Sequence, residues 1–258
     1  MTAWLKGGAL RLVSARLLSI LALLALWQVA ALFADSRALP APGAVFAFIA
    51  DEAVHGELLS NIAITLARVA AAFFVAMAIG CAIGIALGRV QRLDRAFDTW
   101  LVVLLNTPAL VITVLCYIWL GLTEAAAVLA VALNKIPNVA VIVREGTRAL
   151  SPGLDEMVQA YRLSPLDRLR HVILPQLEPY VAGAARSGLA LVWKIVLLVE
   201  LLGRPDGVGY AISIYFQLFD VRAVLGYSLA FMMVMLAIEY FVLQPFESHA
   251  RRWRLAAA

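Results

Sequence analysis

Charged residues are scarce in this chain, and so are the side chains on which most catalytic and metal centres depend. Only 15% of its 258 residues are charged, whereas 64% are hydrophobic, a larger apolar share than soluble domains show. Both cysteines, Cys81 and Cys116, lie inside apolar runs, which indicates neither a disulfide framework nor a thiol nucleophile. The three histidines, His55, His171 and His249, are scattered outside those runs. The composition predicts a membrane protein.

In place of charged and metal-binding side chains, the sequence contains long apolar runs. A helix needs roughly 20 apolar residues to cross a hydrocarbon core about 30 Å thick. Six runs of about that length are bounded by charged residues, and they predict one all-α domain over residues 1–258, a polytopic bundle of six transmembrane helices. The runs are Leu17 to Phe33, Val69 to Leu87, Leu101 to Leu122, Ala125 to Val143, Ala182 to Leu202, and Ala223 to Leu243.

The distribution of Lys and Arg predicts the orientation of this bundle. Fifteen of these residues fall at the two ends of the chain and in the connections on the same side, whereas the opposite connections hold only Arg37, Arg204 and Arg222. Because basic residues favour the cytoplasmic side, both termini and the loop over about 150–178 are expected in the cytoplasm. The net charge of +4 is then explained by topology and anionic lipid, with no need for nucleic acid.

Two of the expected spans contain a proline, Pro108 and Pro137, and polar residues surround each one. Proline removes a backbone hydrogen bond, and broken helices are tolerated at membrane depth where the freed groups face protein or a water-filled cavity. We therefore expect a kink at each proline, facing a path or a seam. The polar neighbours are Asn106 and Thr107 in one span and Asn134, Lys135 and Asn138 in the other. In the second span, Gly80, Gly84 and Gly88 recur every four residues and predict close packing against another helix.

The ionisable residues Lys135, Lys194 and Glu200 fall inside apolar runs. Such groups are costly in hydrocarbon unless they are paired or hydrated, so all three should face inward. In one interpretation a lysine pairs with Glu200 or with carbonyls freed at Pro137. In the other, a lysine contributes positive potential to a passage for anions. Arg68 lies near the end of its span and is expected to extend to lipid headgroups.

A basic amphipathic segment, Glu156 to Pro175, lies between the fourth and fifth spans. Ser151 and Pro152 start one short helix, whose apolar face carries Leu154, Met157, Val158 and Tyr161. Ser164 and Pro165 start a second, with Asp167 as the capping partner and Leu166 and Leu169 as its apolar stripe, and Leu174-Pro175 is expected to end it. The two apolar faces either cover the inner end of the bundle or enter a groove on a partner.

This segment resembles the cytoplasmic signature of ATP-binding-cassette (ABC) importer permeases, which reads Glu-Ala-Ala, three residues, Gly, nine residues, Ile, one residue, Leu-Pro. Aligned on Glu156, the signature places its Gly at Arg162, its Ile at Val172 and its Leu-Pro on Leu174-Pro175, without a gap. Met157 and Val158 replace the two alanines. The resemblance implies that this segment couples the chain to a separate ATPase. The coupling residues that it implies are Glu156, Met157, Ala160, Tyr161, Arg162, Leu163, Ser164, Pro165, Val172, Leu174 and Pro175.

The resemblance covers most of the chain and is closest to permeases for nitrate, aliphatic sulfonates, taurine and bicarbonate. The segments that carry it are Leu39 to Pro42, Thr65 to Val69, Asn106 to Leu110, Val199 to Gly203 and Gly207 to Tyr210. It implies half of a pore in the bacterial inner membrane, paired with a second, usually identical, permease. Two cytoplasmic ABC ATPases would bind ATP and Mg, and a periplasmic protein would deliver the solute. The candidate path residues are Asn106, Pro108, Asn134, Lys135, Asn138, Lys194 and Glu200.

Two other classes of protein fit the sequence less well. A secondary transporter would use Lys135, Lys194 and Glu200 as an ion relay, but it leaves the spacing of the Glu156 to Pro175 segment unexplained. An intramembrane enzyme would need a nucleophile with a base, or a metal cluster, at membrane depth. The sequence shows neither. The Gly-rich stretch Gly203 to Gly209 has no Lys followed by Ser or Thr, so it does not form a nucleotide-binding loop.

Overall fold

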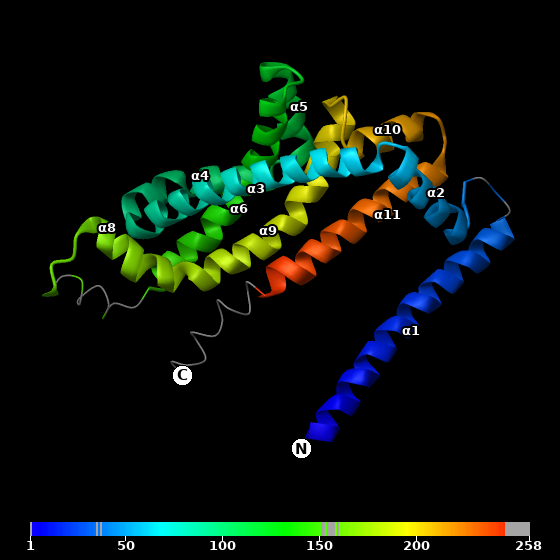
Figure 1. The fold of residues 1–258 in the computed structure, drawn as a ribbon. Coiled ribbons are helices and arrows are strands. Elements are labelled where there is room, and N and C mark those ends of the chain that lie inside the picture. The colour runs from blue at the N-terminus through cyan, green and yellow to red at the C-terminus, as the bar shows by residue number, and fades with distance from the viewer. Residues whose placement is uncertain are drawn as a thin grey trace. The chain divides into compact units, whose positions relative to one another are not determined.

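A computed structural model describes residues 2–34, 36, 38–150, 153, 158 and 160–245, and the regular structure within these ranges is helical (Figure 1). The helices are α1 (Thr2–Ala34), α2 (Pro42–His55), α3 (Leu58–Arg89), α4 (Gln91–Asn106), α5 (Ala109–Leu120), α6 (Glu124–Arg148), α8 (Pro165–Arg168), α9 (Leu174–Gly203), α10 (Val208–Gln217) and α11 (Val221–Ile238). Two π-helical turns, η1 (Leu169–Ile173) and η2 (Glu239–Leu243), precede α9 and follow α11. The all-α expectation is confirmed.

The chain forms two compact units. Unit 1 comprises Met1–Leu59 and Ala211–Ala230, and unit 2 comprises Ser60–Tyr210 and Phe231–Ala258. Among the described residues, α3, α6 and the segment Val221–Val242 are each long and apolar enough to cross a membrane, and α4 with α5 makes a fourth such segment if the bent pair is one span. All six expected runs fall on helices, but the complete six-span topology stays a prediction.

The third expected span is divided at Pro108, as its sequence suggested. The α4 and α5 axes differ by 98°, and Figure 1 shows α5 turning sharply away from α4. Thr107 is extended, with φ −76° and ψ 125°, because proline disfavours the helical conformation of the residue before it. The side chains of Asn106 and Thr107 donate to the carbonyls of Val102 and Val103 at 2.8 and 2.9 Å, which satisfies acceptors in the last turn of α4.

The helix is not interrupted at Pro137, and the kink expected there stays a prediction. Helix α6 runs from Glu124 to Arg148 with Pro137 inside it. Its first turn is capped by Thr123, whose hydroxyl accepts a hydrogen bond from the Ala126 amide at 3.1 Å. Pro137 is buried, so the proline sits in a packed part of unit 2, where neighbouring helices support the backbone.

The glycines of α3 bring it close to α6, as predicted. A Cβ atom at Gly80 would lie 2.6 Å from Val139 Cβ, and one at Gly88 would lie 2.5 Å from Thr147 Cβ. At Gly84 the nearest atom would be the Ala140 carbonyl oxygen, at 2.7 Å. All three distances are shorter than side-chain contacts allow, so these positions admit only glycine at this separation of the helices.

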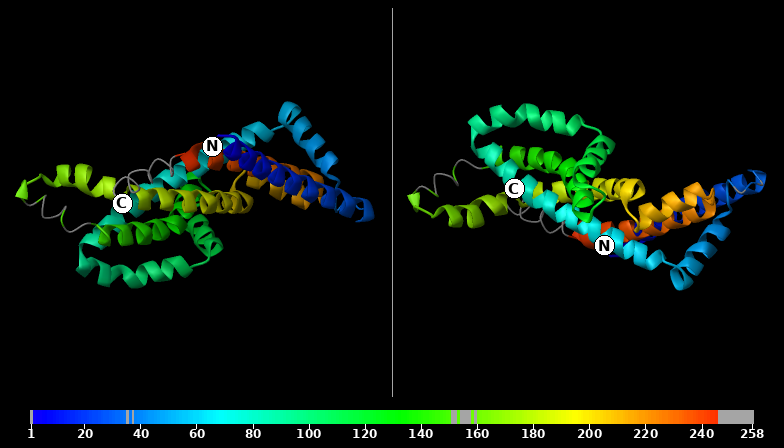
Figure 2. Two further views of the ribbon diagram at one scale, coloured as in Figure 1. Left: turned by 90° about the horizontal axis from the view of Figure 1, so that it is seen from below. Right: turned by 90° about the horizontal axis from the view of Figure 1, so that it is seen from above.

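Helix α9 lies beside α6 and begins earlier than expected (Figures 1 and 2). Leu174-Pro175 was expected to end the cytoplasmic segment, but the backbone stays helical from Pro165 through η1 into α9. Pro175 directly follows the wider η1 turn, and a π-helical turn is a place where a helix accommodates such a local break in its hydrogen bonding. Ile173, Leu177 and Ala184 form a buried core with Val139 and Val143 of α6.

Unit 1 has a small aromatic core of its own. The ring of Phe48 on α2 lies 6.0 Å from that of Tyr215 and 6.3 Å from that of Tyr227, and the two tyrosines lie 5.7 Å apart. The Tyr227 hydroxyl donates to Glu52 at 2.7 Å. A Cβ atom at Gly226 would lie 2.5 Å from the Phe48 ring. These contacts join α2 to residues 211–230.

Candidate functional site

The segment Glu156 to Pro175 turns at Arg162, the position that aligns with the glycine of the signature it resembles. Arg162 has φ +49°, the left-handed conformation that an L-residue adopts only at a cost. The Leu163 amide donates to the Val158 carbonyl at 3.1 Å, five residues back, which is the bond that closes a helix ending in a left-handed residue. The chain therefore makes this turn without glycine. We call the turn and the start of the following helix, residues 160–169, the corner. Of the first helix, only positions 153, 158 and 160 are described, so Glu156 and Met157 lie outside the described residues.

The second part of the corner is capped as its sequence predicts. The Ser164 hydroxyl accepts from the Asp167 amide at 3.1 Å and donates to the Asp167 carboxylate at 2.6 Å. Pro165 then opens α8. This reciprocal pair fixes the start of the helix that continues into α9.

The apolar side chains of the corner are divided between the interior and the surface. Val158 and Val172 are buried, and Leu169 packs against the core shared with α6. Tyr161 and Leu166 are exposed over 76% and 72% of their surface. The remaining coupling candidates that the structure describes are exposed or half-buried: Ala160, Arg162, Leu163, Ser164, Pro165, Leu174 and Pro175. One set of side chains therefore packs the corner against the protein interior, and another set remains exposed on its surface.

Lys135 is buried under α9. Its side chain is 1% exposed, and its Nζ donates to Asn138 Oδ1 at 2.5 Å on the same helix. A Cβ atom at Gly188 would lie 2.5 Å from Lys135 Cε, so the lysine stem passes directly beneath this glycine. Asn134 bonds to the Ala130 carbonyl one turn back, at 2.8 Å. Lys135 thus has a local amide partner, and the expectation that it pairs with Glu200 is wrong.

Unlike the buried Lys135, Lys194 lies on the exposed face of α9. Its ammonium stands 5.6 Å from the centre of the Trp193 ring. Arg186 lies on the same face, two helical turns earlier, with 44% of its side chain exposed and 3.9 Å from Glu239. Eight residues of helix separate the two cations by about 12 Å. Arg186 is one of the fifteen Lys and Arg residues that the sequence assigned to the cytoplasmic side, although its spacing from Lys194 is visible in the sequence.

A buried polar network of unit 2 is centred on Arg68, where the sequence predicted an arginine reaching for headgroups. That prediction is wrong, because Arg68 is only 5% exposed. It donates to Glu200 at 2.8 Å and, through Nε and Nη2, to Glu124 at 2.9 and 2.6 Å, and it also pairs with Asp206. Arg204 donates to the same Glu124 at 2.5 Å. Two guanidinium groups are thus shared among three carboxylates.

The same network holds the start of α10. Glu200, which is 0% exposed, accepts from the Gly209 amide at 2.9 Å and from the Thr65 hydroxyl at 3.0 Å. Thr65 in turn accepts from the Val208 amide, and Asn61 accepts from the Gly207 amide, both at 2.8 Å. Side chains of α3 and α9 therefore cap α10 in place of a local residue.

Gly207 is required in this arrangement. It has φ +98°, and a Cβ atom there would lie 2.5 Å from the Glu200 carboxyl carbon. Glu200 is thus enclosed on all sides within unit 2, unlike Lys194 on the exposed face of α9. Among the described residues, no group of three or more His, Cys, Asp or Glu side chains is placed to hold a metal ion.

These features define a class of protein: a helical membrane subunit with helices long and apolar enough to span, a buried lysine on one of them and a capped corner at the start of the segment that leads into α9. Residues 76–252 match the family described as binding-protein-dependent transport system inner membrane component. The chain belongs to this family, and it is a permease subunit of an ABC importer.

Relatives support this assignment along most of the chain. It is 27% identical to an aliphatic sulfonates transport permease protein of Bacillus subtilis (97% of this chain, 88% of the relative). It is 30% identical to one of Escherichia coli (73% and 72%). It is 24% identical to a nitrate import permease protein of Synechococcus elongatus (82% and 79%).

The fold is shared with solved transporter structures. The inward-facing MetNI methionine ABC transporter aligns with a TM-score of 0.67 at 19% identity, covering 78% of this chain and 99% of that one. An amino acid ABC transporter crystallised with histidines aligns with a TM-score of 0.56 at 22% identity, covering 74% and 93%. The all-helical permease architecture is confirmed.

Proposed function

We propose that this chain forms half of a pathway for a small oxyanion such as a sulfonate, taurine, nitrate or bicarbonate. The observation that carries the proposal is the placement of Lys194 and Arg186 on the exposed face of α9. Cations inside a membrane segment face a cavity or another subunit rather than lipid. Two of them about 12 Å apart on one face would lower the energy of an anion along that face. The names of the sulfonate and nitrate relatives agree with this chemistry.

The other half of the pathway is a second permease, which we propose to be an identical chain. In this arrangement six spans cross the bacterial inner membrane, with both termini and the corner at Arg162 in the cytoplasm. Lipid surrounds the bundle, and nucleic acid is not a partner. A periplasmic binding protein delivers the anion to the outer side.

Energy comes from two cytoplasmic ABC ATPases, which bind ATP and Mg in place of any cofactor in this chain. The support is the corner itself: Tyr161 and Leu166 are exposed beside a backbone that is fixed by the Arg162 turn and the Ser164 cap. An exposed apolar pair on a rigid helix end suits insertion into a groove. Closing the ATPase pair would move the two corners together and open the pathway alternately to each side.

A reconstitution experiment tests the proposed function. Vesicles containing the permease with its ATPase and binding protein should take up a radiolabelled sulfonate only when ATP is present. Uptake should survive collapse of the ion gradients, because the alternative secondary transporter alone depends on them. Uptake driven by a gradient without ATP would overturn the proposal. Equal uptake of a cationic solute would overturn its anion part.

A further inference from the structure

The turn between α10 and α11 contains a second strained residue, Phe219, with φ +56°. The Asp220 amide donates to the Tyr215 carbonyl at 2.9 Å and the Phe219 amide donates to the Phe216 carbonyl at 3.0 Å. These two bonds are the pair that ends a helix with a left-handed residue, a position where glycine is usual. A phenylalanine there costs about 1–2 kcal/mol. Folding alone therefore does not favour an aromatic side chain at this position.

The side chains of this turn are also unusually exposed. Phe219 is 84% exposed, and Phe216 and Leu218 are each 68% exposed. The turn immediately precedes α11, which starts the membrane-crossing segment Val221–Val242. Its residues are thus at the level where a spanning helix meets the lipid headgroups, the level at which aromatic side chains concentrate.

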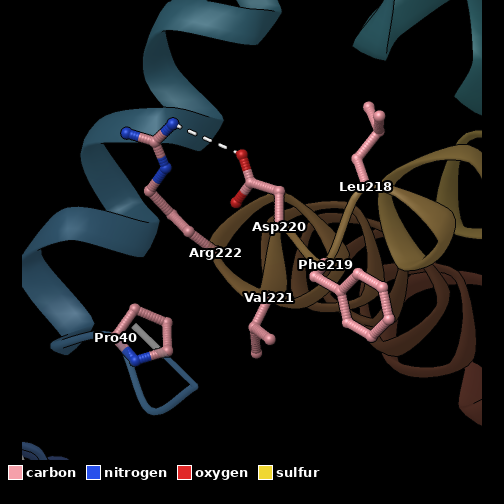
Figure 3. Close-up of a pocket in the computed structure, with 6 residues that line it drawn as sticks. All are labelled: Pro40, Leu218, Phe219, Asp220, Val221 and Arg222. Carbon is pink, nitrogen blue, oxygen red and sulfur yellow. Dashed lines mark ion pairs between the residues drawn. The ribbon is translucent and has the colours of Figure 1, made fainter. Parts of the chain in front are cut away.

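A cavity of about 460 Å³ opens at the same turn, lined by Pro40, Leu218, Phe219, Asp220, Val221 and Arg222 (Figure 3). Arg222 lies 3.6 Å from Asp220, with 52% of its side chain exposed, and its guanidinium stands 5.4 Å from the centre of the Phe48 ring. Figure 3 shows the Asp220 carboxylate directed toward that guanidinium. The long separation of Arg222 and Asp220 and the exposure of the arginine leave room for a charged group beside this ion pair.

Asp220 has a structural task that fixes this geometry. Its Oδ1 accepts from the Ala223 amide at 3.1 Å, which caps the start of α11. Its second oxygen faces Arg222. The guanidinium also stands over the Phe48 ring, which belongs to the aromatic core of unit 1. Arg222 is therefore held at the mouth of this cavity rather than left free in solvent.

We propose that this cavity binds a membrane phospholipid, with the phosphate on Arg222 and the glycerol and upper acyl chain against Leu218, Val221 and Phe219. Three observations favour a lipid over a soluble ligand. The site adjoins a membrane-crossing segment, its apolar side chains are exposed on the turn, and its cation is supported by a ring. Exposed apolar surface next to a basic group at this depth matches a lipid's own division into chain and headgroup. The strain at Phe219 keeps the aromatic side chain on this surface.

The inference does not depend on the proposed transport function, since lipid binding requires neither ATP nor a partner chain. Purified full-length permease can be delipidated in detergent and titrated with phosphatidylethanolamine or phosphatidylglycerol, with bound lipid counted by native mass spectrometry. Arg222→Gln should weaken the tightest lipid site by about tenfold, as expected for loss of one charge-assisted hydrogen bond. Arg148→Gln changes an arginine of similar exposure, 43%, on α6 and should leave that site unchanged.

Phe219→Gly separates binding from folding. It should raise the thermal unfolding temperature of the protein, because it removes the strained conformation, and should nevertheless weaken the tightest lipid site several-fold. Lipid binding that is equal in the wild type, Arg222→Gln and Phe219→Gly would overturn the proposal. Inorganic phosphate at millimolar concentration should not displace the lipid. Displacement by phosphate alone would make this an anion site, and loss of binding-protein affinity in Phe219→Gly with lipid binding intact would make it a protein surface.

Discussion

Arg68 Nη1 donates to Glu200 Oε1 at 2.8 Å, between two residues 132 positions apart in the sequence, and both side chains are buried. Forming such a pair removes two charges from water, so its net contribution to stability is small. Removing one partner is different, because the other charge is then left in a dry site. The Arg68 network consequently acts as a requirement for correct packing of α3, α6, α9 and the start of α10.

Replacing Arg68 with Ala should lower the free energy of unfolding by about 3–5 kcal/mol, since Glu200 would remain buried without its cation. Glu200→Ala should have an effect of similar size. Chemical denaturation of the purified protein measures both. Arg222→Ala removes an arginine from an exposed pair and should change stability by less than about 1 kcal/mol. Equal effects of Arg68→Ala and Arg222→Ala would contradict the role given to burial.

This network shows what the sequence could and could not predict. Thr65, Arg68, Glu200 and Gly209 all lie in segments that resemble the family, but nothing in those segments states that they meet. Arg68 was expected to reach lipid headgroups because it lies near the end of an apolar run. An arginine at such a position can reach headgroups or be buried in a polar network, and the sequence does not distinguish the two. Its partners are 56 to 138 positions away, and helical periodicity carries no information about contacts at such separations.

Local signals were more reliable. The Ser164 cap, the break at Pro108 and the close approach at Gly80, Gly84 and Gly88 are confirmed, because each depends on neighbouring residues or on one helix face. The prediction that the segment ends at Pro175 is wrong for a related reason. Pro175 lies inside a continuous helical backbone, directly after the π-helical turn η1, so its missing amide is accommodated at a local change of helical hydrogen bonding and does not end the helix.

Gly188→Ala should destabilise the protein by about 1–3 kcal/mol, because the added methyl group would displace the buried Lys135 side chain. Gly183 lies on the same helix, and a methyl group added there would have no neighbouring atom within 4 Å. Gly183→Ala should therefore leave the unfolding temperature unchanged or raise it slightly. A second change, Lys135→Ala, should relieve the Gly188→Ala defect. Persistence of the full defect in the double variant would contradict the contact.

Arg162→Gly should stabilise the permease by about 1 kcal/mol, since glycine adopts φ +49° without steric strain. Arg162→Ala keeps the strain and should give no such gain. Arg162→Val should lose stability, because a β-branched residue is less tolerant of this conformation. Thermal unfolding of the three variants provides the comparison. A gain for Ala as large as that for Gly would point to the arginine charge, not the backbone.

Tyr161→Glu or Leu166→Glu should release the ATPase from the permease, because each places a carboxylate on an apolar side chain exposed at the corner. The loss of ATPase on co-purification should be at least tenfold, with the permease still inserted in the membrane. Tyr161→Phe keeps the apolar ring and should retain the ATPase. Full retention by both Glu variants would show that the corner contacts something else.

Lys194→Gln should reduce anion uptake by about tenfold, the change expected when roughly 1.4 kcal/mol of charge stabilisation is lost. Lys194→Arg keeps the charge and should retain most of the activity. Both variants should assemble normally, since Lys194 is exposed on α9 and makes no buried ion pair there. Initial uptake rates, normalised to assembled complex, give the measurement. Wild-type rates for the Gln variant would remove Lys194 from the pathway.

The unbroken helical backbone from Pro165 to Gly203 has a consequence for how mechanical work reaches the membrane. This continuous helical segment begins at α8, carries the cations Arg186 and Lys194 along its middle, and has Glu200 near its far end. A twist applied at α8 must either be absorbed by the widened η1 turn or rotate the cationic face. Because the Arg68 network fixes Glu200 at the far end, we expect α9 to twist rather than translate when a force acts at α8.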